Sequence, residues 1–386
     1  MEYRLENDTL IITCTGKIDS ANATAFGKEI GAIRQANPHS ALVLDFSDIM
    51  YISSAGLRQL LNLNKAESSL SIIDVAPDVY DIFDMTGFNQ ILDVRKPYRN
   101  FSVDGCEVIG EGSNGIVYRI NSDTIIKVFR NANVLDDIKK ERRLAQKALI
   151  MGVNTAISYD VVKVGDKYGS VFELLGADCL SAWMRKDPDH IDKYIEILAD
   201  FAKTINSIDC TGQGLPSNKD TAISWVKWLE GRIDQDKYDK LLALVTAVPD
   251  DNHMNHGDYH SNNIHYDGNE PIIIDMDTLS VGNPVFELGS VYNAYVGFSE
   301  YDHESITHFL KLPVETGRYI WHKFLSLYCG TTDEAELAEI ETKVKVISYT
   351  RLLRRTMKRE PDKTELIDFY KKRLYDCIDA VDSIAL

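Results

Sequence analysis

The chain has 386 residues and a formal net charge of −17, and this length suggests about two to three domains. The acidic balance argues against nucleic acid as a main partner, and no run approaches the roughly 18 apolar residues of a membrane span. We therefore expect no nucleic-acid or membrane partner and, from the polar first residues, no signal peptide. The six cysteines lack metal-ligand spacing, so we expect reduced thiols in a cytoplasmic protein.

Residues 1–100 alternate between strand patterns and helix patterns. Ser20 or Asn22 is a plausible cap of the first helix, and Ser53 or Ser54 can cap the second. This order predicts an α/β domain in which a sheet is covered by helices. The expected strands are 10–14, 41–46 and 70–75, and the expected helices are 22–32, 55–63 and 77–86.

Three segments of this region carry a family pattern: Leu44–Leu57, with the sequence LDFSDIMYISSAGL, then Ile72–Val75 and Val79–Phe88. Through these segments the region resembles the STAS domain of anti-sigma-factor antagonists, over nearly all of residues 1–100. The resemblance implies a regulatory domain that binds a partner protein. In many members of that family, phosphorylation of a serine just before the motif's Gly-Leu switches binding.

The position of that serine is occupied by Ala55 here, and Ser53 and Ser54 lie just upstream. Either serine is a candidate regulatory phosphosite, because a phosphate is well tolerated at a helix N-terminus. The alternative is that both serines only cap the helix. We favour the capping interpretation because the aligned acceptor is missing.

A glycine-rich segment opens the second part of the chain. The stretch Val108–Ile120, VIGEGSNGIVYRI, reads as strand, turn and strand. Its glycines let backbone amides approach phosphates, so Gly110, Gly112 and Gly115, with Val117, are candidate nucleotide-binding residues. No helix pattern follows the turn, which excludes the dinucleotide-binding interpretation of the same motif.

A lysine then interrupts an apolar strand. Lys127 lies within 124–129, where an uncompensated ammonium is costly, so it needs anionic partners. Glu141 falls on the apolar face of a helix expected over 134–150. This pairing is the one that holds a kinase lysine on nucleotide phosphates. The alternative is a surface Glu141 that makes ordinary helix pairs.

The segment 171–176 reads as a strand and a hinge between two lobes. The backbone groups of Glu173 and Leu175 are candidates for adenine recognition, although a plain buried strand fits the same residues. Beyond this hinge, the patterns are mostly helical to the end of the chain.

The sequence HGDYHSNN at His256–Asn263, followed by Asp275, carries the strongest chemical signal. Phosphoryl transfer needs one carboxylate to orient the attacking hydroxyl, and a second carboxylate with an amide oxygen to hold magnesium. We assign the first role to Asp258 and the second to Asn263 and Asp275, which an expected hairpin over 264–274 would bring to one site. His260 and Asp277 are candidate supporting groups, the latter also a possible second metal ligand.

These residues resemble the aminoglycoside phosphotransferase and choline kinase branch of the kinase-like fold, whose pattern is His-Gly-Asp-x-His-x-x-Asn and then Ile-Asp-x-Asp/Glu. One departure is Asn262, where the family usually has Gly. Because Asn tolerates a left-handed backbone, we expect the loop geometry to survive. The short stretch from Thr278 to Asn283 leads directly into a helix pattern at Pro284. It leaves no long platform for a peptide and favours a small hydroxylated substrate.

The expected organisation is a STAS-like domain at 1–100, then an α+β, bilobal protein-kinase-like fold with lobes at 101–176 and 177–386. The expected activity is magnesium- and ATP-dependent phosphorylation of a small-molecule hydroxyl, with GTP not excluded. Two alternatives stay open: a protein kinase acting on a STAS domain, and a non-catalytic nucleotide sensor. The residues do not identify the acceptor, and aminoglycosides, choline, amino sugars and nucleosides all fit.

Overall fold

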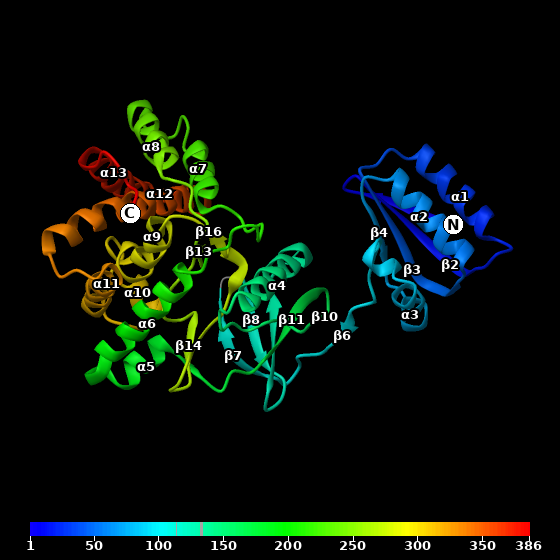
Figure 1. The fold of residues 1–386 in the computed structure, drawn as a ribbon, viewed down its shortest axis with the longest axis horizontal. Helices are drawn as coiled ribbons and strands as arrows, with labels where there is room; N and C mark the ends of the chain where they lie inside the picture. Colours follow the sequence, from blue (N-terminus) through cyan, green and yellow to red (C-terminus); the bar gives the residue numbers. More distant parts are fainter. Residues whose placement is uncertain (113, 132–133) are drawn as a thin grey trace. The chain divides into compact units, whose positions relative to one another are not determined.

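The computed structural model describes residues 1–112, 114–131 and 134–386, so Ser113 of the glycine-rich turn lies outside the described residues. Contacts divide the chain into two compact units. The first contains Met1–Ser102 with Val161–Asp166, and the second contains Val103–Asp160 with Lys167–Leu386 (Figure 1).

The first unit is built on a five-stranded sheet in the order β1-β2-β3-β4-β5, in which β1 is antiparallel to β2 and the other neighbours are parallel. Apolar residues that alternate along the strands, such as Leu42 and Leu44, form a core with the helices. Parallel neighbours joined by helices confirm the predicted α/β pattern. The elements are β1 (Glu2–Glu6), β2 (Thr9–Ile18), α1 (Ala23–Ala36), β3 (Ala41–Ile52), α2 (Ser54–Ala66), β4 (Leu70–Ile73), α3 (Pro77–Met85), η1 (Phe88–Gln90), β5 (Asp93–Val94) and β6 (Arg99–Asn100).

The two candidate serines differ in this structure. Ser53 is the N-cap of α2, and its hydroxyl accepts a hydrogen bond from the Gly56 N–H at 3.4 Å. Ser54 is the first helical residue and its side chain is exposed. Capping therefore occupies Ser53 and leaves Ser54 accessible. At α1 the predicted Asn22 is the N-cap residue, but its side chain makes no capping hydrogen bond and bonds Lys17 and Asp19 instead.

The second unit begins with a sheet that carries the half-buried Lys127. Strands β7 (Glu107–Glu111), β8 (Gly115–Arg119), β9 (Thr124–Phe129) and β11 (Lys167–Glu173) form antiparallel neighbours. Strand β10 (Asp160–Val164) belongs, from Val161 on, to the first unit. β6 pairs in parallel with β10 at Val162 and Lys163. Helix α4 (Leu135–Ile150) follows β9 and turns Ile138, Glu141 and Leu144 inward, as the predicted helix phase requires.

The rest of the second unit is helix-rich, around one large apolar core. Two short strands, β14 (Ile264–Tyr266) and β15 (Pro271–Ile273), form the predicted hairpin, with Ile264 opposite Ile273. The remaining elements are β12 (Asp178–Cys179), α5 (Leu180–Lys186), η2 (Pro188–His190), α6 (Ile191–Asn206), α7 (Asn218–Trp228), α8 (Gln235–Ala247), β13 (Met254–Asn255), η3 (Met276–Thr278), β16 (Ser280–Val281), α9 (Pro284–Tyr295), η4 (Gly297–Ser299), α10 (Ser305–Phe309), α11 (Val314–Cys329), α12 (Glu334–Arg359) and α13 (Thr364–Ala380).

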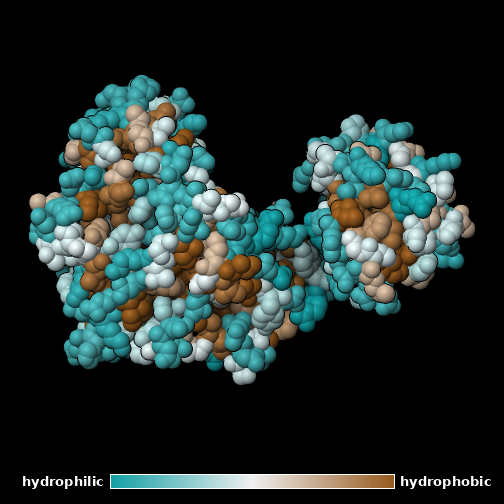
Figure 2. All heavy atoms as spheres, in the orientation of Figure 1, coloured by the Kyte–Doolittle hydropathy of each residue, from teal (hydrophilic) through white to brown (hydrophobic). Residues whose placement is uncertain are grey.

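The surfaces and thiols agree with the composition. Figure 2 shows hydrophilic residues over much of the visible face of each unit, with smaller hydrophobic patches among them. Of the helices in the described ranges, none has the length and apolar content needed to span a bilayer. All six cysteines are free thiols.

Gly115 is the glycine of the turn that the sheet itself requires. A Cβ there would lie 2.4 Å from the Val128 carbonyl oxygen on β9, whereas a Cβ at Gly112 would meet nothing within 4 Å. Of these two glycines, only Gly115 is required by the pairing of β8 with β9, because that pairing leaves no room for a side chain there.

We expect Gly115→Ala to destabilise the second unit by about 1–3 kcal/mol, because backbone must shift to relieve the clash. Gly112→Ala is the matched control, and its free energy of unfolding should stay within about 0.5 kcal/mol of the parent. Denaturant unfolding of the two variants measures this, and equal losses would contradict the packing argument.

Candidate active site

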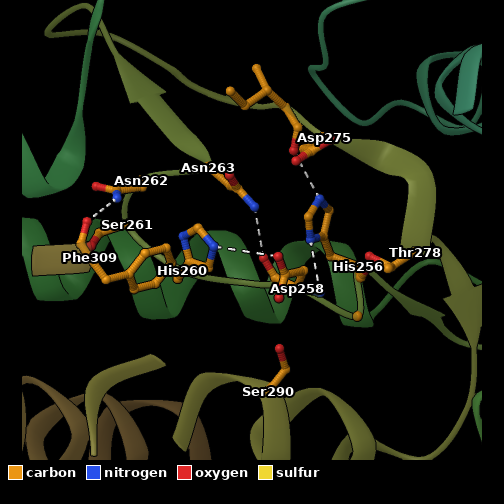
Figure 3. Close-up of polar contacts among 12 residues, drawn as sticks. His256, Asp258, His260, Ser261, Asn262, Asn263, Asp275, Thr278, Ser290 and Phe309 are labelled. Carbon is orange, nitrogen blue, oxygen red and sulfur yellow. Dashed lines mark hydrogen bonds and ion pairs between the residues drawn. The ribbon is translucent and has the colours of Figure 1, made fainter. Parts of the chain in front are cut away.

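The loop that carries Asp258 is fixed by a buried imidazole. His256 is fully buried, and its Nε2 lies 3.1 Å from the Ile274 carbonyl oxygen, which can only accept a hydrogen bond. Nε2 therefore carries the proton, and Nδ1 accepts the Asp258 N–H at 3.3 Å. Burial lowers the pKa of His256, so the imidazole stays neutral. It ties the loop to the strand end that leads to Asp275 (Figure 3).

A second anchor comes from helix α9. Gly257 has φ of 81°, and a Cβ there would lie 2.8 Å from the Thr278 carbonyl oxygen, so the turn requires glycine. Its N–H donates to Oε2 of Glu287 at 3.0 Å. Glu287 is 1% exposed, and burial raises its pKa to about 7. In the described part of the chain, Oε1 of Glu287 has no hydrogen-bond partner. Sequence reasoning did not find this contact.

Asp258 lies between two cationic or potentially cationic groups. His260 Nε2 is 3.6 Å from Oδ2, and Arg351 Nη2 is 3.3 Å from Oδ1. Burial alone would raise the pKa of Asp258, but the hydrogen bond and charge of His260 and the Arg351 guanidinium outweigh it and hold the pKa below the usual range. The group is a carboxylate at any ordinary pH and can orient a hydroxyl through its oxygens.

Arg351 is a site residue that sequence reasoning missed. It projects from α12, and its Nη1 also donates to the Gly257 carbonyl oxygen at 3.0 Å and to Ser290 Oγ at 3.1 Å. Figure 3 places Ser290 beside Asp258, on the side away from Asn263. No local motif marks Arg351, because its partners lie 61 to 94 residues away along the chain.

Asn263 faces the same site through its amide. Its Nδ2 donates to the Asp258 carbonyl oxygen at 3.0 Å, so its Oδ1 takes no part in that contact. The backbone also links the loop to the hairpin end, because the Ile274 N–H donates to the Asn263 carbonyl oxygen at 2.9 Å. Asn263 and Asp275 are therefore held near one another by the hairpin, as predicted.

A left-handed backbone at Asn262 was the expected reason that Asn can replace Gly there, and this reason was wrong. The φ of Asn262 is not positive, so a left-handed backbone is not what lets Asn replace Gly. Instead, its side chain bridges two elements: Oδ1 accepts from Ser181 Oγ of α5, and Nδ2 donates to the Phe309 carbonyl oxygen at 2.8 Å. The non-glycine residue of the site with a left-handed backbone is Asp275, whose φ is 65°.

Lys127 sits between two carboxylates from different elements. Its Nζ lies 2.8 Å from Asp275 Oδ1 and 3.6 Å from Glu141 Oε1. Burial lowers the pKa of Lys127, but the charges of Asp275 and Glu141 outweigh this and raise it, so the ammonium is retained. Glu141 is inward-facing and paired, not a surface residue of α4.

Negative charge gathers beside this ammonium. Burial, and then repulsion from Asp275, raises the pKa of Asp277 to about 6. Burial also raises the pKa of Glu141 to about 7 despite the Lys127 charge. Burial is the main cause of both raised pKa values, and the charge of Asp275 adds to it at each group. Within 1–112, 114–131 and 134–386, no three His, Cys, Asp or Glu side chains group as a ready metal site; the donors here are two carboxylates and an amide oxygen.

The other candidate nucleotide-binding residues lie on the same sheet. Val117 of β8 is directly opposite Lys127 of β9 and also pairs with Gly110 of β7. A Cβ at Gly110 would make only ordinary contacts, so protein packing does not explain that glycine or Gly112. Glu173 ends β11, and Leu175 follows it in the hinge.

This geometry fits a kinase-like fold in which Lys127, Asp258 and Asp275, from three separate segments, lie in one unit. The chain belongs to the phosphotransferase enzyme family, APH, whose model matches residues 105–311. Residues 1–101 match the model of the STAS domain. The chain therefore joins an N-terminal STAS domain to a phosphotransferase domain.

Among curated proteins, BtrV of Bordetella bronchiseptica, whose name assigns it provisionally to the anti-sigma factor antagonists, is 34% identical over 92 residues. These cover 22% of this chain and 78% of BtrV. Among solved structures, ADP-bound aminoglycoside phosphotransferase APH(2'')-Ib has a TM-score of 0.48 at 16% identity, covering 70% of this chain and 93% of its own. The GDP and kanamycin complex of APH(2")-IIia has a TM-score of 0.47 at 16% identity, covering 78% of this chain and 98% of its own.

Glu287 should make stability depend on pH. Its folded pKa of about 7 lies above the ordinary 4.5, so its contribution is complete below about pH 4.5 and is lost as pH rises through about 7. Glu287→Gln keeps the acceptor for the Gly257 N–H but removes this titration. We expect the free energy of unfolding of the parent to fall relative to the variant between about pH 5 and pH 8, by a few kcal/mol at most.

Urea unfolding at intervals across this range measures the difference. Glu141 titrates in both proteins, so its effect cancels. Parallel pH profiles of parent and variant would show that Glu287 is not desolvated as described.

Proposed function

We propose that this protein is a phosphotransferase that moves the γ-phosphoryl group of ATP, or of GTP, to a hydroxyl of a small molecule. The observation that carries the proposal is the convergence of four side chains in one unit. Lys127 contacts Asp275, Asn263 bonds the backbone of Asp258, and His256 ties Asp258 to the strand before Asp275. Each has the residue type that its role requires.

The roles of the residues follow from their contacts. Lys127 is charged and pre-oriented by Glu141 and Asp275, so it can bind the phosphates of a nucleotide. Gly110 and Gly112 leave room for backbone amides to approach the same phosphates. Asp258 stays ionised and orients the acceptor hydroxyl for in-line attack, while Arg351 and His260 hold its carboxylate in place. Catalysis is then chiefly positioning and electrostatics.

The donor set fits magnesium. Asn263 Oδ1 and Asp275 Oδ2 take no part in the contacts that orient those side chains, and oxygen atoms of these types are what Mg²⁺ prefers. Asp277 adds a third oxygen donor, whose pKa is raised by burial and then by the charge of Asp275. Bound there, the cation would neutralise phosphate charge; Asn263 and Asp275 would hold it, with Asp277 in support.

The short connection after Asp275 supports a small acceptor. Only η3, β16 and a turn separate Asp275 from α9, which begins at Pro284. The Asn283 side chain caps that helix by accepting the Val285 N–H at 3.1 Å, and β16 is paired with β13. The backbone of this segment is therefore already paired within the domain, and it offers no extended strand for a peptide substrate.

The STAS domain is proposed to bind a regulatory protein. Large apolar side chains are exposed on the first unit, including Met50 at 75%, Met85 at 88% and Ile91 at 58%. Met50 and Tyr51 lie at the end of β3, just before Ser54. Exposed apolar groups beside a potential phosphosite are what a switchable interface requires.

A second candidate is a protein kinase that acts on a STAS serine. The accessibility of Ser54 favours it, whereas the short segment after Asp275 argues against it. Mass spectrometry after incubation with ATP and magnesium alone separates the two, because phosphate on Ser54 or Ser53 would support this candidate. A non-catalytic sensor would bind nucleotide and transfer phosphate to no acceptor.

The metal role of Asp275 is tested by Asp275→Ala. We expect the variant to fold and to lose the magnesium-dependent part of the thermal stabilisation by ATP, because a magnesium ligand is gone. The matched control is Asp379→Ala, which breaks a similar pair with Lys237 at 2.7 Å, away from the site. Thermal shift with ATP, with and without magnesium, measures both. A variant with an unchanged magnesium-dependent shift would remove Asp275 from the site.

The orienting role of Asp258 is tested by Asp258→Asn, which keeps the shape and removes the charge. We expect turnover of an acceptor to fall by about two orders of magnitude or more, with little change in nucleotide affinity. Asp267→Asn, at the hairpin tip, is the control, since its Oδ1 can still accept the Asn269 N–H. If Asp258→Asn retained most of its turnover, the assignment would fail.

A further inference from the structure

Helix α12 presents a row of cations that starts at the proposed catalytic aspartate. Arg351 contacts Asp258. Beyond it, four further cations follow at helical spacings of three and four, so they share the face that Arg351 presents to the site. The row, here named the α12 cation strip, consists of Arg351, Arg354, Arg355, Lys358 and Arg359.

The strip is not neutralised by the protein. Within the described ranges, Arg354, Arg355, Lys358 and Arg359 form no ion pair, although the chain carries a net charge of −17. The acid whose charge acts on Arg355, Glu360, is itself paired with Lys363.

Two of these arginines are also partly desolvated. Nε of Arg354 is buried and has no hydrogen-bond partner in the described part of the chain. Burial lowers the pKa of both Arg354 and Arg355, and the neighbouring charge of Arg359 adds to it at Arg355. Removing a guanidinium group from water without pairing it with an anion costs free energy. An external anion bound to the strip would offset this cost.

Aromatic rings border the strip on two elements. The Arg354 guanidinium lies 6.0 Å from the ring centroid of Trp228 on α7, and that of Arg355 lies 5.1 Å from the ring of Phe298 on η4. Trp225, also on α7, lies 5.9 Å from the Arg351 guanidinium. These contacts hold the guanidinium planes in fixed orientations, which favours planar recognition of carboxylate or phosphate.

We propose that the α12 cation strip binds an anionic group, phosphate or carboxylate, of the phosphate acceptor. The acceptor is then a small hydroxylated anion. This rests on the proposed function, because it supplies the substrate class for that same site. Arg354 to Arg359 lie three to eight residues beyond Arg351, about 4.5 to 12 Å along the axis. That span matches the distance between a hydroxyl and an acidic group within one small molecule.

The strip also disfavours a polycationic acceptor. An aminoglycoside or amino sugar beside Asp258 would place ammonium groups near guanidinium groups that have no anion, and like charges at close range are repulsive. Among hydroxylated compounds of one scaffold, the anionic form should therefore be preferred.

The test uses the full chain and four compounds of one scaffold: glucose 6-phosphate, gluconate, glucose and glucosamine. Product mass spectrometry with ATP and magnesium measures transfer, and calorimetric titration with inorganic phosphate measures anion binding without turnover. We expect kcat/KM for an anionic compound to exceed that of glucose and glucosamine by about tenfold or more, since charge-assisted contacts are strong. A higher kcat/KM for glucose 6-phosphate than for gluconate would identify the bound group as phosphate, and the reverse order would identify it as carboxylate.

The double variant Arg354→Gln/Arg355→Gln should weaken phosphate binding and raise KM for the anionic compound by about tenfold. The matched control is Arg373→Gln, which removes an arginine lying 5.3 Å from the Phe369 ring on α13. If the double variant does not fold, Lys358→Gln at an exposed position gives the same test with a smaller effect.

Equal phosphate affinity in parent and strip variants, or preference for glucosamine, would overturn the proposal. Failure of the proposed function is recognised separately. In that outcome no compound is phosphorylated, while phosphate still binds and the strip variants still lose it, which supports the strip as an anion site.

Discussion

The active-site region depends on one half-buried ammonium. Lys127 is held by Asp275 at 2.8 Å and Glu141 at 3.6 Å, so a strand, a helix and the segment after the β14–β15 hairpin meet at a single charge. A lysine inside an apolar strand is stable only with such partners. Its two carboxylates exceed its one charge, and Asp277 adds a third. This excess of negative charge is unfavourable for stability alone, and it is the arrangement that a divalent cation with its bound phosphates compensates.

The loop is held by buried side chains that bond its backbone N–H groups. His256 is neutral because it is buried, and this allows Nδ1 to accept from the Asp258 N–H while Nε2 donates to Ile274. Glu287 receives the Gly257 N–H from beneath the same turn. The reactive carboxylates are thus positioned by groups that need not change their own charge during the reaction. Such preorganisation is consistent with a reaction that is chiefly positioning.

Sequence reasoning found what is local. The hairpin was predictable from Asp267-Gly268-Asn269 between short apolar runs, and the inward phase of Glu141 was predictable from Ile138 and Leu144. Contacts between distant elements were not predictable. Arg351 reaches Asp258 from α12, and Asn262 bridges Ser181 to Phe309, because the packing of the helices decides both. The reason given for Asn262 failed on the same ground: side-chain bridging, not backbone freedom, suits Asn to that position.

Net charge was a poor guide to the local field. The chain is strongly acidic, yet the carboxylate proposed to orient the acceptor hydroxyl faces a guanidinium, and four more cations continue along the same helix. Because exposed charges are screened over about 8 to 10 Å in physiological salt, the distant acids contribute little at Asp258. Arg351 therefore has two local effects. Together with His260 it keeps Asp258 ionised, so that Asp258 orients the hydroxyl better than it accepts its proton. It also begins a positive surface beside the attacking hydroxyl. A carboxylate of low basicity suits a loose phosphoryl transfer, in which the hydroxyl proton need not leave early. The cations beside it then select the acceptor by charge, not by the strength of the base.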